Sequence, residues 1–139
     1  MTRHMSESAR REQILEAARL CFVESGYLAT RMDDVARKAD LSKGGIYFYF
    51  PSKHALLEAL VEEENVRSMA FLELVRGQEG AVAGKLELLG RFYPLYFAEH
   101  PEAARFFVVL SEAALREPAM RDRLRTMQQV YLDLSLIHI

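Results

Sequence analysis

The side chains best suited to bind another molecule are two tyrosines and two lysines, which lie close together in the first half of the chain. Tyr47 and Tyr49 lie between Lys43 and Lys53 in the stretch KGGIYFYFPSK. A tyrosine hydroxyl or a lysine ammonium at a surface can donate hydrogen bonds to phosphate oxygens. The group therefore predicts contacts with the backbone of a nucleic acid.

Two adjacent glycines stand shortly before the tyrosines, at a point where a helix is expected to begin. Gly44 and Gly45 each cost roughly 1 kcal/mol in a helix relative to alanine. Close approach of the backbone to another molecule would offset that cost. Lys43, at the same end, can donate to O6 and N7 of guanine. This end of the helix is therefore predicted to face the base edges of a duplex.

Two short helices are expected to position these residues. The first runs from about Arg31 to Ala39, with Thr30 as its N-cap and Asp33 completing a capping box. The second runs from Lys43 to about Tyr49, after Ser42 as N-cap and before Pro51, which ends it. Residues at helical spacing are predicted to face the core, namely Met32, Val35, Ala36, Ala39, Ile46 and Phe50.

A longer helix is expected on each side of this pair. The earlier one begins at Ser6 or Ser8 and ends near Gly26, with Cys21 as a small core residue on its apolar stripe. The later one begins at Ser52 and runs to about Arg76.

The ordered set T-x-x-D-V-A, then L-S-K-G-x-I-Y-x-Y-F-x-x-K-x-x-L, resembles the tetracycline-repressor (TetR) family of bacterial transcription regulators. The resemblance is specific from about Arg11 to Leu60. It implies an all-α fold, with a three-helix DNA-binding domain at residues 9–54 and its helix-turn-helix at about 30–49. A long fourth helix would join it to a helical regulatory domain at 55–139.

The resemblance also implies a function and a set of contacts. The protein would be a sequence-specific DNA-binding regulator, a repressor released by a small hydrophobic effector. A complete member of the family would bind a palindromic operator as a homodimer. The expected DNA-binding residues are Thr30, Ser42, Lys43, Gly44, Gly45, Tyr47, Phe48, Tyr49 and Lys53.

The second half of the chain is rich in aromatic residues. After a linker at 77–80, one strongly apolar helix is expected to kink or end early at Pro94, and another is expected to start at Pro101. Their aromatic side chains predict either plain core or an effector pocket near Tyr93, Phe97 and Phe107. Nothing in the sequence identifies the effector.

The end of the chain departs from the family pattern. Family members usually have two further long helices that form the dimer, whereas this chain ends at Ile139 in an apolar tail. We therefore expect a truncated sequence that does not form the usual dimer. Side chains that would have faced the missing helices are expected to be partly exposed, namely Phe106, Val109, Leu110 and Met127.

Composition narrows the class of protein. The net charge of the chain is −2, but residues 30–53 contain five basic and three acidic residues. This distribution suits a basic DNA-binding segment in an otherwise acidic protein. The single cysteine excludes an intrachain disulfide. No run of about 18 apolar residues and no signal peptide pattern are present, which favours a cytoplasmic protein.

Enzyme and metal signatures are weak. The four histidines have no i, i+4 histidine partner and the sequence has no Cys-x-x-Cys, so no catalytic site, metal or cofactor is expected. The alternative is a helical protein–protein interaction module without DNA binding. The two differ in salt dependence, because binding to phosphates weakens steeply as salt rises.

Overall fold

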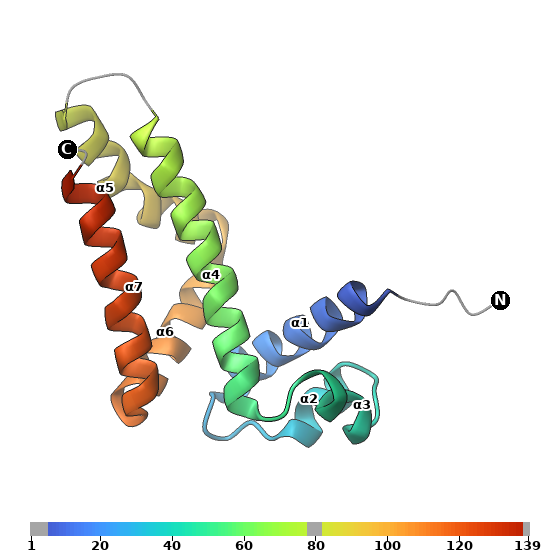
Figure 1. The fold of residues 1–139 in the computed structure, drawn as a ribbon. Coiled ribbons are helices and arrows are strands. Elements are labelled where there is room, and N and C mark those ends of the chain that lie inside the picture. Colours follow the sequence, from blue (N-terminus) through green and yellow to red (C-terminus); the bar gives the residue numbers. More distant parts are fainter. Residues whose placement is uncertain (1–5, 78–81, 138–139) are drawn as a thin grey trace. The chain divides into compact units, whose positions relative to one another are not determined.

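The computed structural model describes residues 6–77 and 82–137, though not every side chain of the later helices. Every regular element in these ranges is an α-helix, which confirms the all-α prediction (Figure 1). The chain forms two compact units, Met1–Glu62 and Glu63–Ile139. The helices are α1 (Glu7–Ser25), α2 (Met32–Lys38), α3 (Lys43–Tyr49), α4 (Lys53–Arg76), α5 (Val82–Glu99), α6 (Pro101–Arg116) and α7 (Pro118–Ile137).

The first unit is built around the apolar stripe of α1. α1 packs against α2, and α2 packs against α3 (Figure 1). Burying one large aliphatic or aromatic side chain stabilises a fold by about 1.5–3 kcal/mol, so this shared core holds the three helices together. Its most deeply buried side chains are Ile14, Ala18, Phe22, Val35, Ile46, Phe50, Leu56, Leu57, Leu60 and Val61.

Both ends of α1 are capped. The Ser6 hydroxyl accepts a hydrogen bond from the Ala9 amide at 3.1 Å, so Ser6 rather than Ser8 is the N-cap. Gly26 ends the helix as predicted. Its backbone φ of 82° is one that residues other than glycine rarely adopt. Cys21 is buried as predicted, and burial raises the pKa of its thiol.

The predicted cap of α2 is wrong. Thr30 is 2% exposed, and its hydroxyl donates back to the carbonyl oxygens of Gly26 at 2.8 Å and Cys21 at 3.2 Å. Arg31 occupies the cap position instead, and its amide donates to the carboxylate of Asp34 at 2.9 Å. Thr30 therefore ties the chain to the end of α1, which uses its hydroxyl inside the unit.

The turn between α2 and α3 depends on one residue with a positive φ. Asp40 has a φ of 53°. Its amide donates to the carbonyl of Arg37 at 3.2 Å, and the amide of Leu41 donates to that of Ala36 at 2.9 Å. This pair of bonds is the Schellman arrangement, which ends a helix sharply. It sets the direction in which the chain enters α3.

The remaining helix starts mostly follow the predictions. The Ser52 hydroxyl accepts from the Ala55 amide at 3.1 Å and caps α4, and Pro101 and Pro118 begin α6 and α7. α5 continues past Pro94 to Glu99, so this proline does not end the helix early, and the alternative of a kink at Pro94 stays a prediction. Residues 78–80 of the expected linker lie outside the described residues.

The second unit consists of the later part of α4 with α5, α6 and α7. α6 packs against both α5 and α7. Phe106, Val109 and Leu110 are buried, so the expectation of partial exposure is wrong for these three, while Met127 is half-buried. α7 follows α6 directly and covers part of its apolar face.

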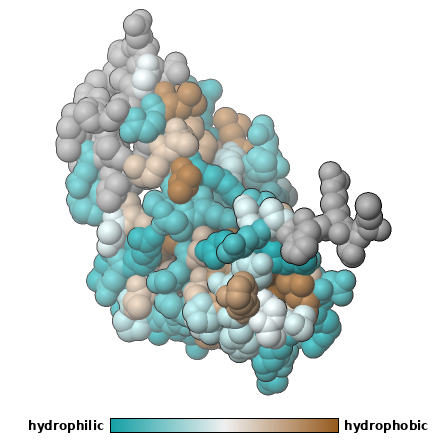
Figure 2. Space-filling model, turned by 45° about the vertical axis from the view of Figure 1, so that its right-hand side comes forward, coloured by the Kyte–Doolittle hydropathy of each residue, from teal (hydrophilic) through white to brown (hydrophobic). Residues whose placement is uncertain are grey.

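The surface carries separate apolar side chains. On the face shown in Figure 2, hydrophobic patches are interrupted by hydrophilic side chains. None of the helices, over the part of the chain described, is long and apolar enough to cross a membrane.

Candidate functional site

α3 is held in place by one buried face and one cap. Ile46 is fully buried, and the hydroxyl of Ser42 accepts from the amide of Gly45 at 3.0 Å. Ser42, Lys43, Gly44 and Tyr47 are exposed, and Tyr49 is half-buried. Most of the predicted DNA-binding residues of this helix therefore lie together on its outer face.

Phe48 is the most exposed aromatic residue on α3. Its side chain is 79% exposed, against 43% for Tyr47, and its ring meets that of Tyr49 edge-on at 5.1 Å between centroids. Because the Phe48 side chain is mostly exposed, it adds little to the stability of the first unit. The fold therefore does not explain a large apolar residue at this position. An apolar side chain on a helix that lies in the major groove of DNA can contact a thymine methyl group.

Lys43 is paired within the unit. Its ammonium nitrogen lies 3.0 Å from a carboxylate oxygen of Asp33 on α2. The hydrogen bond and the charge of Asp33 raise the pKa of Lys43. The pair is exposed and is worth little to stability, but it orients the ammonium in front of the first turn of α3. Sequence reasoning assigned Asp33 to a cap and missed this contact.

Lys53 also makes contacts inside the unit. Its ammonium donates to the carbonyl oxygens of Tyr27 at 2.7 Å and Leu28 at 3.3 Å, and lies 4.4 Å from the centre of the Tyr27 ring. The side chain is half-buried. Lys53 thus braces the segment between α1 and α2, and its positive charge stays at the surface of the unit.

The two glycines differ in their surroundings. A Cβ at Gly45 would lie 3.2 Å from the Ser42 hydroxyl oxygen, so a side chain there presses on the cap. A Cβ at Gly44 would meet nothing within 4 Å. The packing of the chain explains the absence of a side chain at Gly45 but leaves it unexplained at Gly44.

One predicted contact, that of Thr30, changes in the structure. Thr30 is buried with its hydroxyl engaged, so it does not belong to the exposed face of α3. Arg11 of α1 lies over the Phe50 ring at 4.3 Å. The Gln13 side-chain amide donates to the Ala39 carbonyl at 2.7 Å and so links α1 to the end of α2. No pattern in the sequence predicts this contact.

The basic residues of α2 are also paired. Lys38 lies 2.8 Å from Glu24, and Arg37 lies 3.6 Å from Asp34. The local excess of positive charge in residues 30–53 is therefore partly neutralised at the surface.

The second unit contains a cavity of about 130 Å³. Phe97 and Phe107, two of the predicted ligand-binding residues, line it, whereas the side chain of Tyr93 lies outside the described residues. Sequence reasoning missed Glu64, Arg67 and Ser68 of α4, which also line it. Their only signal is the i, i+3 spacing of an acid and a base on one helix face.

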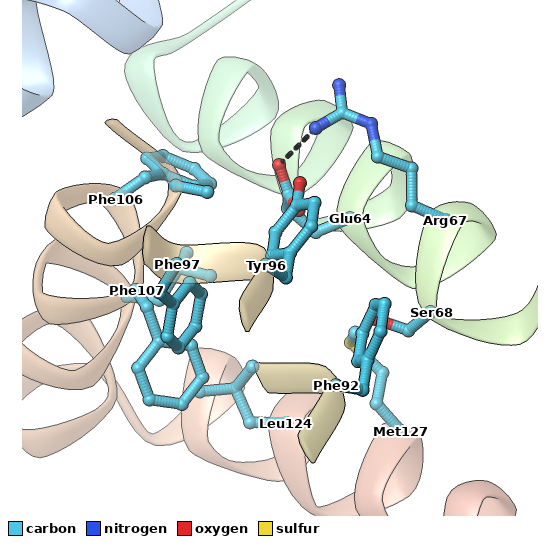
Figure 3. A pocket seen from close by; sticks show the side chains of 12 residues that line it. Glu64, Arg67, Ser68, Phe92, Tyr96, Phe97, Phe106, Phe107, Leu124 and Met127 are labelled. Carbon is cyan, nitrogen blue, oxygen red and sulfur yellow. Dashed lines mark hydrogen bonds and ion pairs between the residues drawn. The ribbon is translucent and has the colours of Figure 1, made fainter. Parts of the chain in front are cut away.

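The cavity has an aromatic part and a polar part. In Figure 3 the hydroxyl of Tyr96 points toward the ion pair of Arg67 and Glu64, and Phe97 and Phe107 lie on the other side. The ion pair spans 2.9 Å. No group of three or more metal-ligating side chains occurs among the described residues.

Comparisons with known proteins agree with this geometry. Residues 14–60 match the model of the bacterial regulatory proteins of the tetR family. The chain is 35% identical over 82 residues to the HTH-type transcriptional repressor Rv1474c of Mycobacterium tuberculosis, which covers 59% of this chain and 42% of that protein. It is 30% identical over 122 residues to the HTH-type transcriptional regulator RutR of Escherichia coli, covering 88% of this chain and 56% of RutR.

The solved structure of Salmonella enterica GusR has the same fold. It superposes with a TM-score of 0.81 and 27% identity, covering 95% of this chain and 67% of GusR. The chain spans about half the length of the curated relatives it matches. From the match over α1 to α4 and the likeness to these regulators, the chain belongs to the tetR family of bacterial regulatory proteins.

Proposed function

We propose that the protein is a sequence-specific DNA-binding regulator that acts as a repressor, with α3 as its recognition helix. The single observation that carries this proposal is the outer face of α3, where Phe48 is 79% exposed and Gly44 has open space around it. Neither residue serves the packing of the first unit. Both suit a helix whose N-terminal turn enters the major groove.

The proposed contacts fall into two groups. Lys43, Gly44, Gly45 and Phe48 face the base edges, where an ammonium can donate to guanine and an apolar ring can meet a thymine methyl. Ser42, Tyr47, Tyr49 and Lys53 donate to phosphates and fix the position of the helix on the duplex. Thr30 has no place in this set because its hydroxyl is used inside the unit.

A homodimer on a palindromic operator fits this proposal. Two recognition helices must be spaced by about 34–36 Å to read adjacent major grooves on one side of a duplex. We propose the bacterial cytoplasm as the place of action, since it gives direct access to chromosomal DNA.

Control by a small molecule is the second part of the proposal. The cavity of about 130 Å³ is lined in part by Glu64, Arg67 and Ser68, which belong to α4. α4 is one continuous helix from Lys53 to Arg76, and its first residues belong to the DNA-binding unit. A ligand that shifts α4 would change the spacing of two recognition helices and release the operator.

Selection from a library of random duplexes tests the proposal. We expect the purified chain to enrich one sequence, and Phe48→Ala to bind that sequence less well than wild type. Leu115→Ala is the matched control, because Leu115 is 81% exposed on α6 in the other unit. Failure of the wild-type chain to enrich any sequence would contradict sequence-specific binding.

A further inference from the structure

The cavity of the second unit limits the chemistry of its ligand. Its walls are mostly aromatic and aliphatic, with Phe92, Phe97, Phe107, Leu124 and Met127 among them. The rings of Phe92 and Tyr96 stack at 5.4 Å, and those of Phe97 and Phe107 lie 6.0 Å apart. Such rings interact favourably with a further ring through stacked or edge-on contacts.

The volume limits the size of that ligand. An apolar cavity of about 150 Å³ is large enough to bind benzene. The present cavity, at about 130 Å³, is of the same size class. It accommodates one six-membered ring with a small substituent, whereas two fused rings would require the walls to move.

The polar part limits the charge. Arg67 and Glu64 lie 2.9 Å apart, so the one cation and the one carboxylate among the lining side chains that the structure describes neutralise each other. Burial lowers the pKa of Arg67, but the hydrogen bond with Tyr96 and the nearby carboxylates of Glu64 and Glu63 outweigh it and raise the pKa. An anionic ligand would meet Glu64, and a cationic one would meet Arg67.

We propose that this cavity binds an uncharged single-ring aromatic compound with one hydroxyl group, of the phenol class. The ring lies among Phe92, Phe97 and Phe107, and the hydroxyl exchanges hydrogen bonds with the polar end formed by Tyr96 and the ion pair of Arg67 and Glu64. This ligand class rests on the proposed control of the protein by a small molecule, and names what that molecule is.

Fluorine NMR of 4-fluorophenol with the purified chain, in the absence of DNA, tests the class. We expect saturable binding that unlabelled phenol displaces. At pH 7, 4-fluorobenzoate tests the exclusion of an anion and 6-fluoro-2-naphthol tests the size limit. Both should bind at least tenfold more weakly. Lack of saturable binding of 4-fluorophenol, or equal binding of either comparison compound, would overturn the proposal.

Variants locate the bound ring. Leu124→Phe adds volume at a half-buried residue of the cavity wall and should weaken the binding of 4-fluorophenol at least tenfold. Met127→Phe changes the same wall and is the second variant if the first does not fold. Leu115→Phe adds the same group at an exposed site of α6 away from the cavity and should leave binding unchanged. Equal affinity in wild type and a folded wall variant would place the ligand elsewhere.

The hydroxyl contact has a separate test. Tyr96→Phe should weaken 4-fluorophenol several-fold and leave fluorobenzene unchanged, because only the phenol has a hydroxyl to lose its partner. An equal loss for both probes would contradict a specific role for the Tyr96 hydroxyl. Because these measurements contain no DNA, their failure is distinguishable from a failure of DNA binding, which is measured without any ligand.

Discussion

Gly44 gives the sharpest prediction, because the fold and the proposed DNA contact make opposite demands on it. In the protein alone, a methyl group at this position meets nothing within 4 Å. Replacing a glycine by alanine without strain stabilises a fold by about 0.4–1 kcal/mol. For a domain of about 60–100 residues, 1 kcal/mol raises Tm by about 4–8 °C. Gly44→Ala should therefore be more stable than wild type.

DNA binding should change in the other direction. If the backbone of α3 lies against base edges at Gly44, the added methyl group forces the helix away from the groove. We expect a loss of about 1–3 kcal/mol, comparable with one good base contact, which corresponds to about 5–150-fold in affinity. Fluorescence anisotropy with the selected duplex measures the loss, and thermal unfolding followed by circular dichroism measures the gain.

A matched control separates the two effects. Gly84 also lies in the first turn of a helix, and a Cβ added there would meet nothing within 4 Å, but it belongs to the other unit. Gly84→Ala should gain stability and keep wild-type affinity. If Gly44→Ala binds the duplex as tightly as wild type, the recognition helix does not approach DNA through this turn, and the reasoning is refuted.

Three further variants test other parts of the account. Phe48→Ala should lower affinity for the selected sequence about 5–150-fold, as expected for one lost base contact, while Leu115→Ala should leave it unchanged. Equal affinities of wild type, Phe48→Ala and Leu115→Ala in anisotropy titrations would contradict base contact by Phe48. Thr30→Val should lower the free energy of unfolding by about 1–2 kcal/mol in urea denaturation, because two carbonyl oxygens lose a buried donor. The hydroxyl of Thr126 donates to the Asp122 carbonyl oxygen at an exposed site, so Thr126→Val should change the free energy of unfolding little. The raised pKa of Cys21 means that the folded protein keeps its thiol proton where the unfolded chain loses it, so this residue's contribution to stability is full below about pH 8.5 and falls as pH rises above it. Urea denaturation at pH 7 and 9.5 should therefore show a larger decrease for wild type than for Cys21→Ala, and equal decreases would contradict the assignment.

Much of the first unit follows from local sequence signals. Ser42 as an N-cap and Pro51 beyond the last turn predict both ends of α3, because capping and the restriction before proline act over at most three or four residues. The error at Thr30 has a physical cause. Its hydroxyl could cap α2 or bond backward to α1, and only the tertiary packing that buries it decides between these partners.

Contacts between distant residues were beyond sequence reasoning. The bonds of Lys53 to Tyr27 and Leu28, and of Gln13 to Ala39, join residues 25 or 26 positions apart. Such pairs leave no periodic pattern. The polar side of the cavity was missed for a related reason, since Glu64 and Arg67 look like an ordinary exposed pair on α4 until α5 and α6 are packed beside them.

The burial of Phe106, Val109 and Leu110 was misjudged for a different reason. The expectation assumed that their partners are helices beyond the end of this chain. In the structure α6 packs against both α5 and α7, so neighbouring helices within the same unit cover these side chains. An apolar face predicts that a partner exists but does not identify it.

The salt dependence of DNA binding tests the central claim most directly. The affinity of wild type for the selected duplex should fall steeply with salt, with a log–log slope of about −0.9 for each phosphate neutralised. Lys53→Gln removes the charge but keeps amide donors for the Tyr27 carbonyl, and should reduce the slope by about one without changing sequence preference. Lys38→Gln, at a lysine paired with Glu24 away from α3, should leave the slope unchanged. An affinity that does not vary with salt would contradict DNA binding through α3 and favour a protein–protein interaction module instead.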